Sequence, residues 1–211
     1  FHARQIAHYI AYSKGLTDAD LGRVYRLKAK GSKPQKLGTP FSEENLLETV
    51  LRHPNRWHRE TALRIIGNQK ESRWIPRLRE VLGKEAGQPA LQALWALNLC
   101  GAFGKEVALE TLGHENPHVR RWTVRLLGDQ GEVSQEVSHA LANLAKRESD
   151  AETLSQLAAT ARRLPAKDGL PVIGQLSHRK AYANDPHIPL MVWWAIEAHA
   201  KNHKAVLKHF E

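Results

Sequence analysis

The chain has 211 residues, of which 42% are hydrophobic and 25% charged, and its formal net charge at pH 7 is +9. This composition predicts one or two folded domains and excludes a disordered polyelectrolyte. The single cysteine, Cys100, excludes an internal disulfide and a zinc site of the Cys-x-x-Cys type. No apolar run approaches the roughly 20 residues of a membrane-spanning helix.

Residues 1–41 are predicted to form an N-terminal segment distinct from the rest of the chain. Within it, residues 22–27 alternate apolar and basic side chains, a pattern typical of a short strand. Residues 28–36 are basic and contain Gly, Ser and Pro, which indicates a solvated linker. Residues 1–14 fit a short helix and a short strand equally well.

From Ser42 to the end, residues 42–211, the sequence is predicted to be helical almost throughout. Ser42 provides a capping hydroxyl, and acidic residues follow it in what would be the first turn. Apolar residues then recur at helical spacing, at Leu46, Leu47, Val50 and Leu51. A Pro-containing break at residues 53–55 separates this helix from a second one, which ends near Gly67.

The unit of helix, Pro-containing turn, helix and Gly recurs along the chain. The matched segments are 53–59 with 114–120, 64–69 with 125–130, 62–66 with 93–97, and 94–97 with 193–196, at shifts of 61, 61, 31 and 99 residues. A helix pair that repeats every thirty-odd residues is the signature of an α-solenoid.

We therefore predict an all-α fold of about five stacked helix pairs. The second helices are expected near residues 55–67, 88–100, 117–129, 150–163 and 187–201. One pair cannot bury its apolar stripe alone, so stacking is expected to produce a continuous core with Leu94, Leu126 and Ile196 buried in successive layers.

The turn that precedes the predicted helix at residues 117–129 resembles the corresponding turn of HEAT repeats. It reads Asn-Pro-His-Val-Arg at 116–120 and is followed by Leu-Gly at 127–128, with weaker copies at 54–67 and 185–188. The resemblance implies a right-handed solenoid in which the turn Asp or Asn and the Arg form a ladder between repeats. The residues matching that ladder are Asn55, Arg59, Asn116, Arg120 and Asp185.

A wider resemblance covers nearly the whole chain, on residues 22–27, 51–57, 93–97, 116–125 and 185–197. In this order they look like the middle segment of bacterial proteins described as putative membrane-bound dehydrogenases, between a β-propeller and a c-type haem domain with Cys-x-x-Cys-His. The resemblance implies a secreted or periplasmic location. Because this chain has neither propeller blades nor that haem motif, it implies a scaffold without enzymatic activity or cofactor.

Motifs that carry catalytic or metal chemistry are missing from the sequence. There is no Gly-rich phosphate loop of either common type and no Gly-x-Ser-x-Gly. His199 and His203 have the i, i+4 spacing that a metal can bridge, but no third ligand accompanies them. We therefore predict no catalytic residues and no metal site.

The repeat alignment places four large side chains at one position of the second helices, namely Arg64, Trp95, Arg125 and Trp194. Because second helices line the concave side of HEAT proteins, these residues are candidates for a binding stripe. Guanidinium and indole groups both make large contacts with acidic or aromatic partners. The alternative is structural, with the tryptophans in the core and the arginines stacked on them internally.

Two functions remain open on the sequence alone. A scaffold that binds protein, or holds neighbouring domains of the same polypeptide in register, needs only the repeat. The alternative is a nucleic-acid-binding HEAT-like protein, similar to DNA glycosylases with a basic concave face, because the chain is strongly basic.

Overall fold

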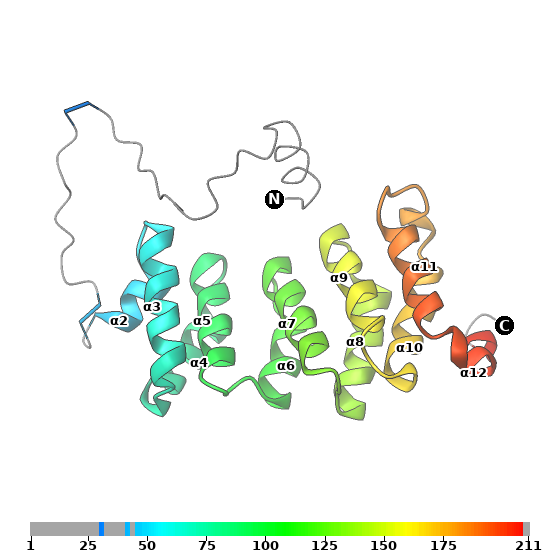
Figure 1. The fold of residues 1–211 in the computed structure, drawn as a ribbon, viewed down its shortest axis with the longest axis horizontal. Coiled ribbons are helices and arrows are strands. Elements are labelled where there is room, and N and C mark those ends of the chain that lie inside the picture. The colour runs from blue at the N-terminus through cyan, green and yellow to red at the C-terminus, as the bar shows by residue number, and fades with distance from the viewer. Residues whose placement is uncertain (1–29, 32–40, 43–44, 209–211) are drawn as a thin grey trace, which may run out of the picture. The chain divides into compact units, whose positions relative to one another are not determined.

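A computed structural model describes residues 30–31, 41–42 and 45–208, and it leaves the side chains of His203 and Lys208 undescribed. The chain divides into two compact units, Phe1–Gly38 and Thr39–Glu211. The predicted strand at 22–27 lies outside the described residues. In the part that is described, helices make up the regular structure and no strand occurs (Figure 1). The predicted all-α class is therefore confirmed.

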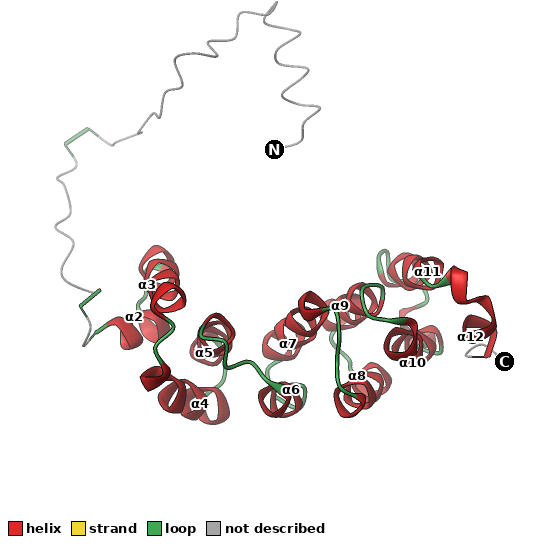
Figure 2. Ribbon diagram, turned by 60° about the horizontal axis from the view of Figure 1, so that its bottom comes forward, coloured by secondary structure: helices red, strands yellow, loops and turns green. Residues whose placement is uncertain are grey.

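The helices of the second unit form five consecutive pairs arranged in two layers (Figure 2). The first helices of the pairs are α2 (Leu46–Arg52), α4 (Ile75–Lys84), α6 (Lys105–Thr111), α8 (Gln135–Arg147) and α10 (Ala166–Ser177). The second helices are α3 (Arg56–Gln69), α5 (Gln88–Leu99), α7 (Pro117–Gln130), α9 (Ala151–Ala161) and α11 (Ile188–Ala198).

Three short 3-10 helices and one final helix complete the described elements. They are η1 (Ser72–Trp74), η2 (Lys180–Tyr182), η3 (Ala200–Asn202) and α12 (His203–Lys208). The second helices agree with the predicted ranges to within a few residues. Neighbouring second helices pack on one another along the row from α3 to α11, as in a solenoid.

Local chemistry sets the beginnings and ends of these helices. The side chains of Asn55 and Asn116 each accept a hydrogen bond from a backbone N–H in the first turn of α3 and α7. These bonds satisfy donors that an uncapped helix leaves without partners. At the other end, Gly131 stops α7 in the left-handed conformation with φ 77°, a geometry that glycine adopts without strain.

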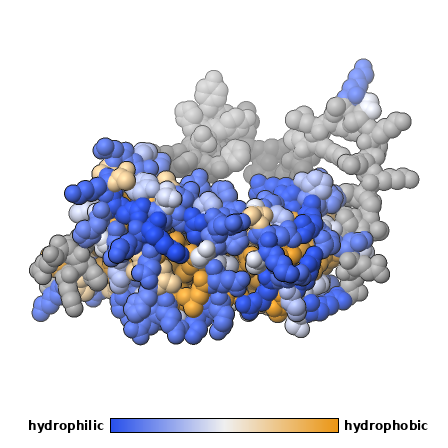
Figure 3. Space-filling view, turned by 180° about the vertical axis from the view of Figure 1, so that it is seen from behind, coloured by the Kyte–Doolittle hydropathy of each residue, from blue (hydrophilic) through white to orange (hydrophobic). Residues whose placement is uncertain are grey.

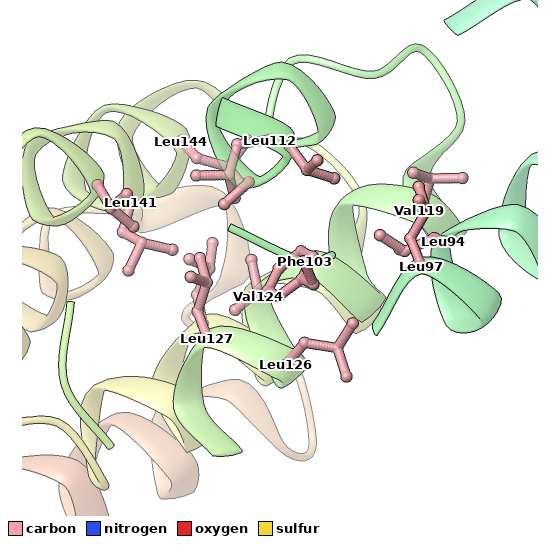
Figure 4. Close-up of a cluster of buried hydrophobic side chains, with 14 of the residues drawn as sticks. Leu94, Leu97, Phe103, Leu112, Val119, Val124, Leu126, Leu127, Leu141 and Leu144 are labelled. Carbon is pink, nitrogen blue, oxygen red and sulfur yellow. The ribbon is translucent and has the colours of Figure 1, made fainter. Parts of the chain in front are cut away.

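The core runs between the two layers, and Figure 4 shows its central part around α5, α6, α7 and α8. Leu94 is fully buried and Leu126 is 8% exposed, whereas Ile196 is only partly buried at the edge of the core. Burial of one such leucine stabilises the fold by about 1.5–3 kcal/mol. The prediction that these three side chains are buried is therefore confirmed for Leu94 and Leu126, whereas Ile196 is buried only in part.

The first helices of the pairs, which form the first layer, carry many of the ion pairs on the surface. Arg77 and Lys84 both pair with Glu80 on α4, and Lys105 of α6 pairs with Glu136 of α8. The face seen from behind in Figure 3 is accordingly mostly hydrophilic. None of the described helices is long and apolar enough to cross a membrane.

Candidate functional site

The four predicted stripe residues all lie on second-layer helices, but their surroundings differ. Arg64 on α3 and Arg125 on α7 are exposed, and Trp95 on α5 is half-buried. Trp194 on α11 is 44% exposed. The purely structural interpretation, with both tryptophans in the core, therefore does not describe Trp194.

An aromatic stack joins α5 to α7. The rings of Trp95 and Trp122 meet edge to face, with centroids 4.9 Å apart and planes at 77°. The guanidinium of Arg125 lies over the Trp122 ring, 5.3 Å from its centroid. The Trp122 ring thus contacts both an indole and a cation, and the quadrupole of aromatic rings favours contacts of both kinds.

Trp122 was not among the site residues predicted from the sequence. The repeat alignment compares single positions, and Trp122 lies three residues before the aligned Arg125. Residues at i and i+3 share one face of a helix, so the three-residue spacing from Arg125 is the signal by which Trp122 could have been found.

A shallow hollow of about 370 Å³ opens beside this stack. Its lining comes from α7, α9 and α11 and consists of Arg121, Trp122, Arg125, Glu152, Ser155, Gln156, Ala159 and Met191. Of the predicted stripe residues only Arg125 belongs to it. Arg64, Trp95 and Trp194 are not among the lining residues.

The charges around the hollow are unevenly matched. Arg121 forms an ion pair with Glu152 across the α7–α9 boundary. Arg125 has Asp129 at 4.0 Å, one turn away on α7, but the same carboxylate is also paired with Arg163, which follows the end of α9. Arg125 therefore shares a distant and already engaged carboxylate, and its 54% exposed side chain remains accessible to a ligand.

Beyond the hollow, α11 exposes large apolar side chains. Leu190, Trp193 and Trp194 are 46%, 60% and 44% exposed. Their i, i+3, i+4 spacing places them on one face, whereas Val192 and Ala195 are buried on another. This helix is apolar on both its buried and its exposed sides, which is typical of a surface that meets a partner.

The predicted ladder residues form the turns that lead into the second helices. Nη1 of Arg59 donates to the carbonyls of His53 and Pro54 at 2.7 and 3.0 Å. Nη1 of Arg120 donates to the carbonyls of His114 and Glu115, both at 2.8 Å. Equivalent arginines therefore bind equivalent carbonyls, 61 residues apart.

Arg120 alone of these two arginines also crosses to the next helix pair. Its Nε and Nη2 each donate to the Glu148 carboxylate at 2.7 Å, a two-pronged ion pair with a carboxylate only 1% exposed. Glu148 further accepts from the backbone N–H groups of Ser149 and Asp150 at 2.9 and 3.0 Å.

Burial by itself would raise the pKa of the Glu148 carboxyl. The hydrogen bonds from Arg120 and from the two backbone N–H groups outweigh burial, so this pKa lies below its ordinary value. Glu148 is therefore a carboxylate at neutral pH, and the Arg120–Glu148 pair locks the third helix pair to the fourth.

The contact between Glu148 and Arg120 was not predicted from the sequence, although the position of Glu148 carries a signal for it. Glu148 lies two residues before the cap residue of α9, and Glu85 lies two residues before that of α5. Glu85 pairs with Arg52 of α2 instead of with Arg59. In both turns, a glutamate two residues before the cap residue thus forms an ion pair with an arginine of the preceding helix pair.

Two residues of the fifth pair, Arg179 and Tyr182, also contact the segment 146–149. Arg179 donates to the carbonyls of Lys146 and Glu148, and the hydroxyl of Tyr182 donates to the carbonyl of Ser149 at 2.7 Å. The predicted ladder residue Asp185 does not reach the preceding pair in this way. Its carboxylate accepts from the N–H groups of His187 and Ile188 at 2.8 and 2.9 Å, which lowers its pKa.

In the described part of the chain, no three His, Cys, Asp or Glu side chains come together as metal ligands. His199 of the predicted His pair is buried, and the Ala161 carbonyl accepts a hydrogen bond from its Nε2 at 2.9 Å. The other histidine of the pair, His203, begins α12, and its side chain is one of the two that the structure leaves undescribed. His199 thus contributes to the packing of α9 on the end of α11.

Comparison with known proteins gives no match. No family model matches the chain, and no curated protein or solved structure is significantly similar to it.

Proposed function

We propose that this chain is a non-catalytic, HEAT-like scaffold that binds protein through its second-layer helices. The exposed apolar face of α11 is the observation that carries the proposal. Leu190, Trp193 and Trp194 belong neither to the buried core nor to the partly buried side chains packed against it. Large aromatic side chains supply much of the energy of protein interfaces, and contiguous exposed apolar surface marks interaction sites.

The repeated turns support the HEAT-like character. Arg59 and Arg120 make the same carbonyl contacts after Asn caps 61 residues apart, so the motif recurs as a three-dimensional unit. In the multidomain proteins that this chain resembles, the equivalent segment separates a β-propeller from a c-type haem domain. We propose the same spacer role here, with any dehydrogenase or haem chemistry belonging to other segments.

The proposal is tested by photo-crosslinking from opposite layers. A benzoylphenylalanine at Trp193 on α11 should capture a protein that the same group at Lys84 on α4 does not capture. The purified partner should then bind Trp194→Ala at least about tenfold more weakly, because hot-spot tryptophans contribute 2 kcal/mol or more. Arg79→Gln, an exposed change on α4, should leave the affinity unchanged. Equal capture from both layers contradicts the proposal.

Nucleic acid is the second candidate, favoured by the net charge of +9. Several arginines near the second helices are already engaged, because Arg120, Arg121 and Arg163 pair with Glu148, Glu152 and Asp129. Such pairs leave less positive charge for phosphates, which supports the protein-binding function instead. Binding to duplex DNA with a steep salt dependence would favour the nucleic-acid alternative, and lack of retention on heparin would remove it.

A further inference from the structure

The hollow between α7, α9 and α11 suggests which chemistry a partner presents. We propose that it receives an acidic side chain of a partner protein, whose carboxylate binds Arg125 while a neighbouring apolar side chain lies on Met191 and the exposed face of α11. This inference rests on the proposed protein-binding function and specifies its ligand.

The binding group is already in place before a ligand arrives. The rings of Trp95 and Trp122 pack edge to face, and the guanidinium of Arg125 lies over the Trp122 ring. A guanidinium that rests on an aromatic ring loses less freedom on binding than one that extends into water. A planar guanidinium also offers two parallel N–H groups to one carboxylate.

The charge balance selects an acidic ligand. Two guanidinium groups, those of Arg121 and Arg125, line the hollow against one carboxylate, that of Glu152. Arg121 and Glu152 are paired with each other, which leaves Arg125 as the group with charge to offer. The whole chain carries a formal charge of +9, so it also attracts acidic partners over longer distances and repels a second copy of itself.

The apolar part of the ligand follows from the other walls. Met191 lines the hollow and Trp194 lies three residues further along α11, so the two share one side of that helix. The thioether of a methionine adapts to apolar side chains of different shape. A volume of about 370 Å³ suits one or two side chains of an extended segment.

The experiment uses fluorescein-labelled, capped decapeptides and the full chain, with binding followed by fluorescence anisotropy at fixed salt. The first peptide alternates glutamate and leucine. Lysine–leucine and glutamate–serine peptides of the same length test the charge and the apolar part separately. A single-stranded oligonucleotide of ten nucleotides tests the phosphate alternative.

Three variants test the hollow, and one controls for general charge. Arg125→Gln removes the cation, Arg125→Lys keeps the charge without the planar fork, and Ala159→Glu places a carboxylate in the lining. Arg79→Gln on α4 is the control, because its side chain is 47% exposed, close to the 54% of Arg125. Circular dichroism confirms that each variant is folded before binding is measured.

The glutamate–leucine peptide should bind the unmodified chain more tightly than the other two peptides. Arg125→Gln and Ala159→Glu should each weaken it about tenfold or more, and Arg125→Lys by less, because hydrogen bonds between charged groups are among the stronger ones. Arg79→Gln should change it less than twofold.

Equal binding of the lysine–leucine peptide overturns the inference, as does an Arg125→Gln variant that binds normally. Binding of the oligonucleotide with the same dependence on Arg125 also overturns it, in favour of phosphate. In each of these cases the protein-binding function still stands if a crosslinked partner depends on Trp194. If the crosslinked partner is indifferent to Trp194, the proposed function fails, whatever the peptides show.

Discussion

Replacement of Glu148 by alanine should destabilise the fold far more than replacement of its exposed counterpart, Glu152. Glu148→Ala removes two charge-assisted hydrogen bonds from Arg120 and leaves that guanidinium, 16% exposed, with only its carbonyl contacts. Breaking a buried ion pair from one side costs about 3–5 kcal/mol. We therefore expect a loss of about 4 kcal/mol in the free energy of unfolding.

The matched control is Glu152→Ala, because Glu152 pairs with Arg121, the residue that follows Arg120 on α7. Arg121 pairs with Glu152, whose side chain is 66% exposed. Exposed ion pairs contribute at most about 1 kcal/mol, so Glu152→Ala should be nearly neutral. Both variants remove one glutamate that pairs with an arginine of α7, so they change the net charge equally and differ in how deeply the removed carboxylate is buried.

Urea denaturation followed by far-ultraviolet circular dichroism measures both effects. With a slope of about 2 kcal/mol per molar urea, Glu148→Ala should lower the midpoint by about 2 M and Glu152→Ala by less than about 0.5 M. A changed slope would show that the helix pairs no longer unfold together. If both variants share one midpoint, the Arg120–Glu148 pair does not lock the third helix pair to the fourth.

Three further predictions concern stability. The folded-state pKa of Glu148 lies below its ordinary value of 4.5, so the carboxylate contributes its full stabilisation above about pH 4.5 and loses it as the pH falls through the lower pKa. Between about pH 5 and pH 3, the urea midpoint should therefore fall more steeply for the unmodified chain than for Glu148→Gln. Gly169→Ala should lower the melting temperature strongly, because the new Cβ would lie 2.3 Å from the Ala161 carbonyl oxygen and 2.9 Å from Nε2 of His199. Gly83→Ala, whose Cβ would meet only the flexible end of Glu110 at 3.2 Å, should leave the melting temperature unchanged or raise it by the few degrees that about 0.5 kcal/mol provides.

The helix pairs were predictable because their signals are local. Caps such as Asn116, turn prolines and apolar stripes act within a few residues, so the sequence itself reveals where α7 begins and ends. Even the weakest repeat, around residues 150–163, forms α9, because Asp150 caps it and Leu154 and Leu157 supply its buried side.

The hollow and the Glu148 contact were not predictable in the same way. The lining of the hollow joins α7 to residues of α9 and α11 that lie about thirty to seventy positions away in sequence. Which of these side chains meet depends on the offset between stacked helices, and no single repeat encodes that offset. Arg120 matched a known motif, but its partner Glu148 lies in the repeat that matches worst.

A position within the repeat does not by itself determine how exposed a residue is. Trp95 and Trp194 occupy one aligned position, yet Trp95 is half-buried and Trp194 is 44% exposed. On α5 the indole has α7 beside it and meets Trp122, whereas α11 has only α9 as a second-layer neighbour among the described helices. The part of the Trp194 side chain that remains in water adds no stability to the fold, so burial does not account for the whole of this side chain. The residues most informative about binding are therefore those, like Trp194, that occupy an aligned repeat position but whose large apolar side chain is not covered by the neighbouring helices.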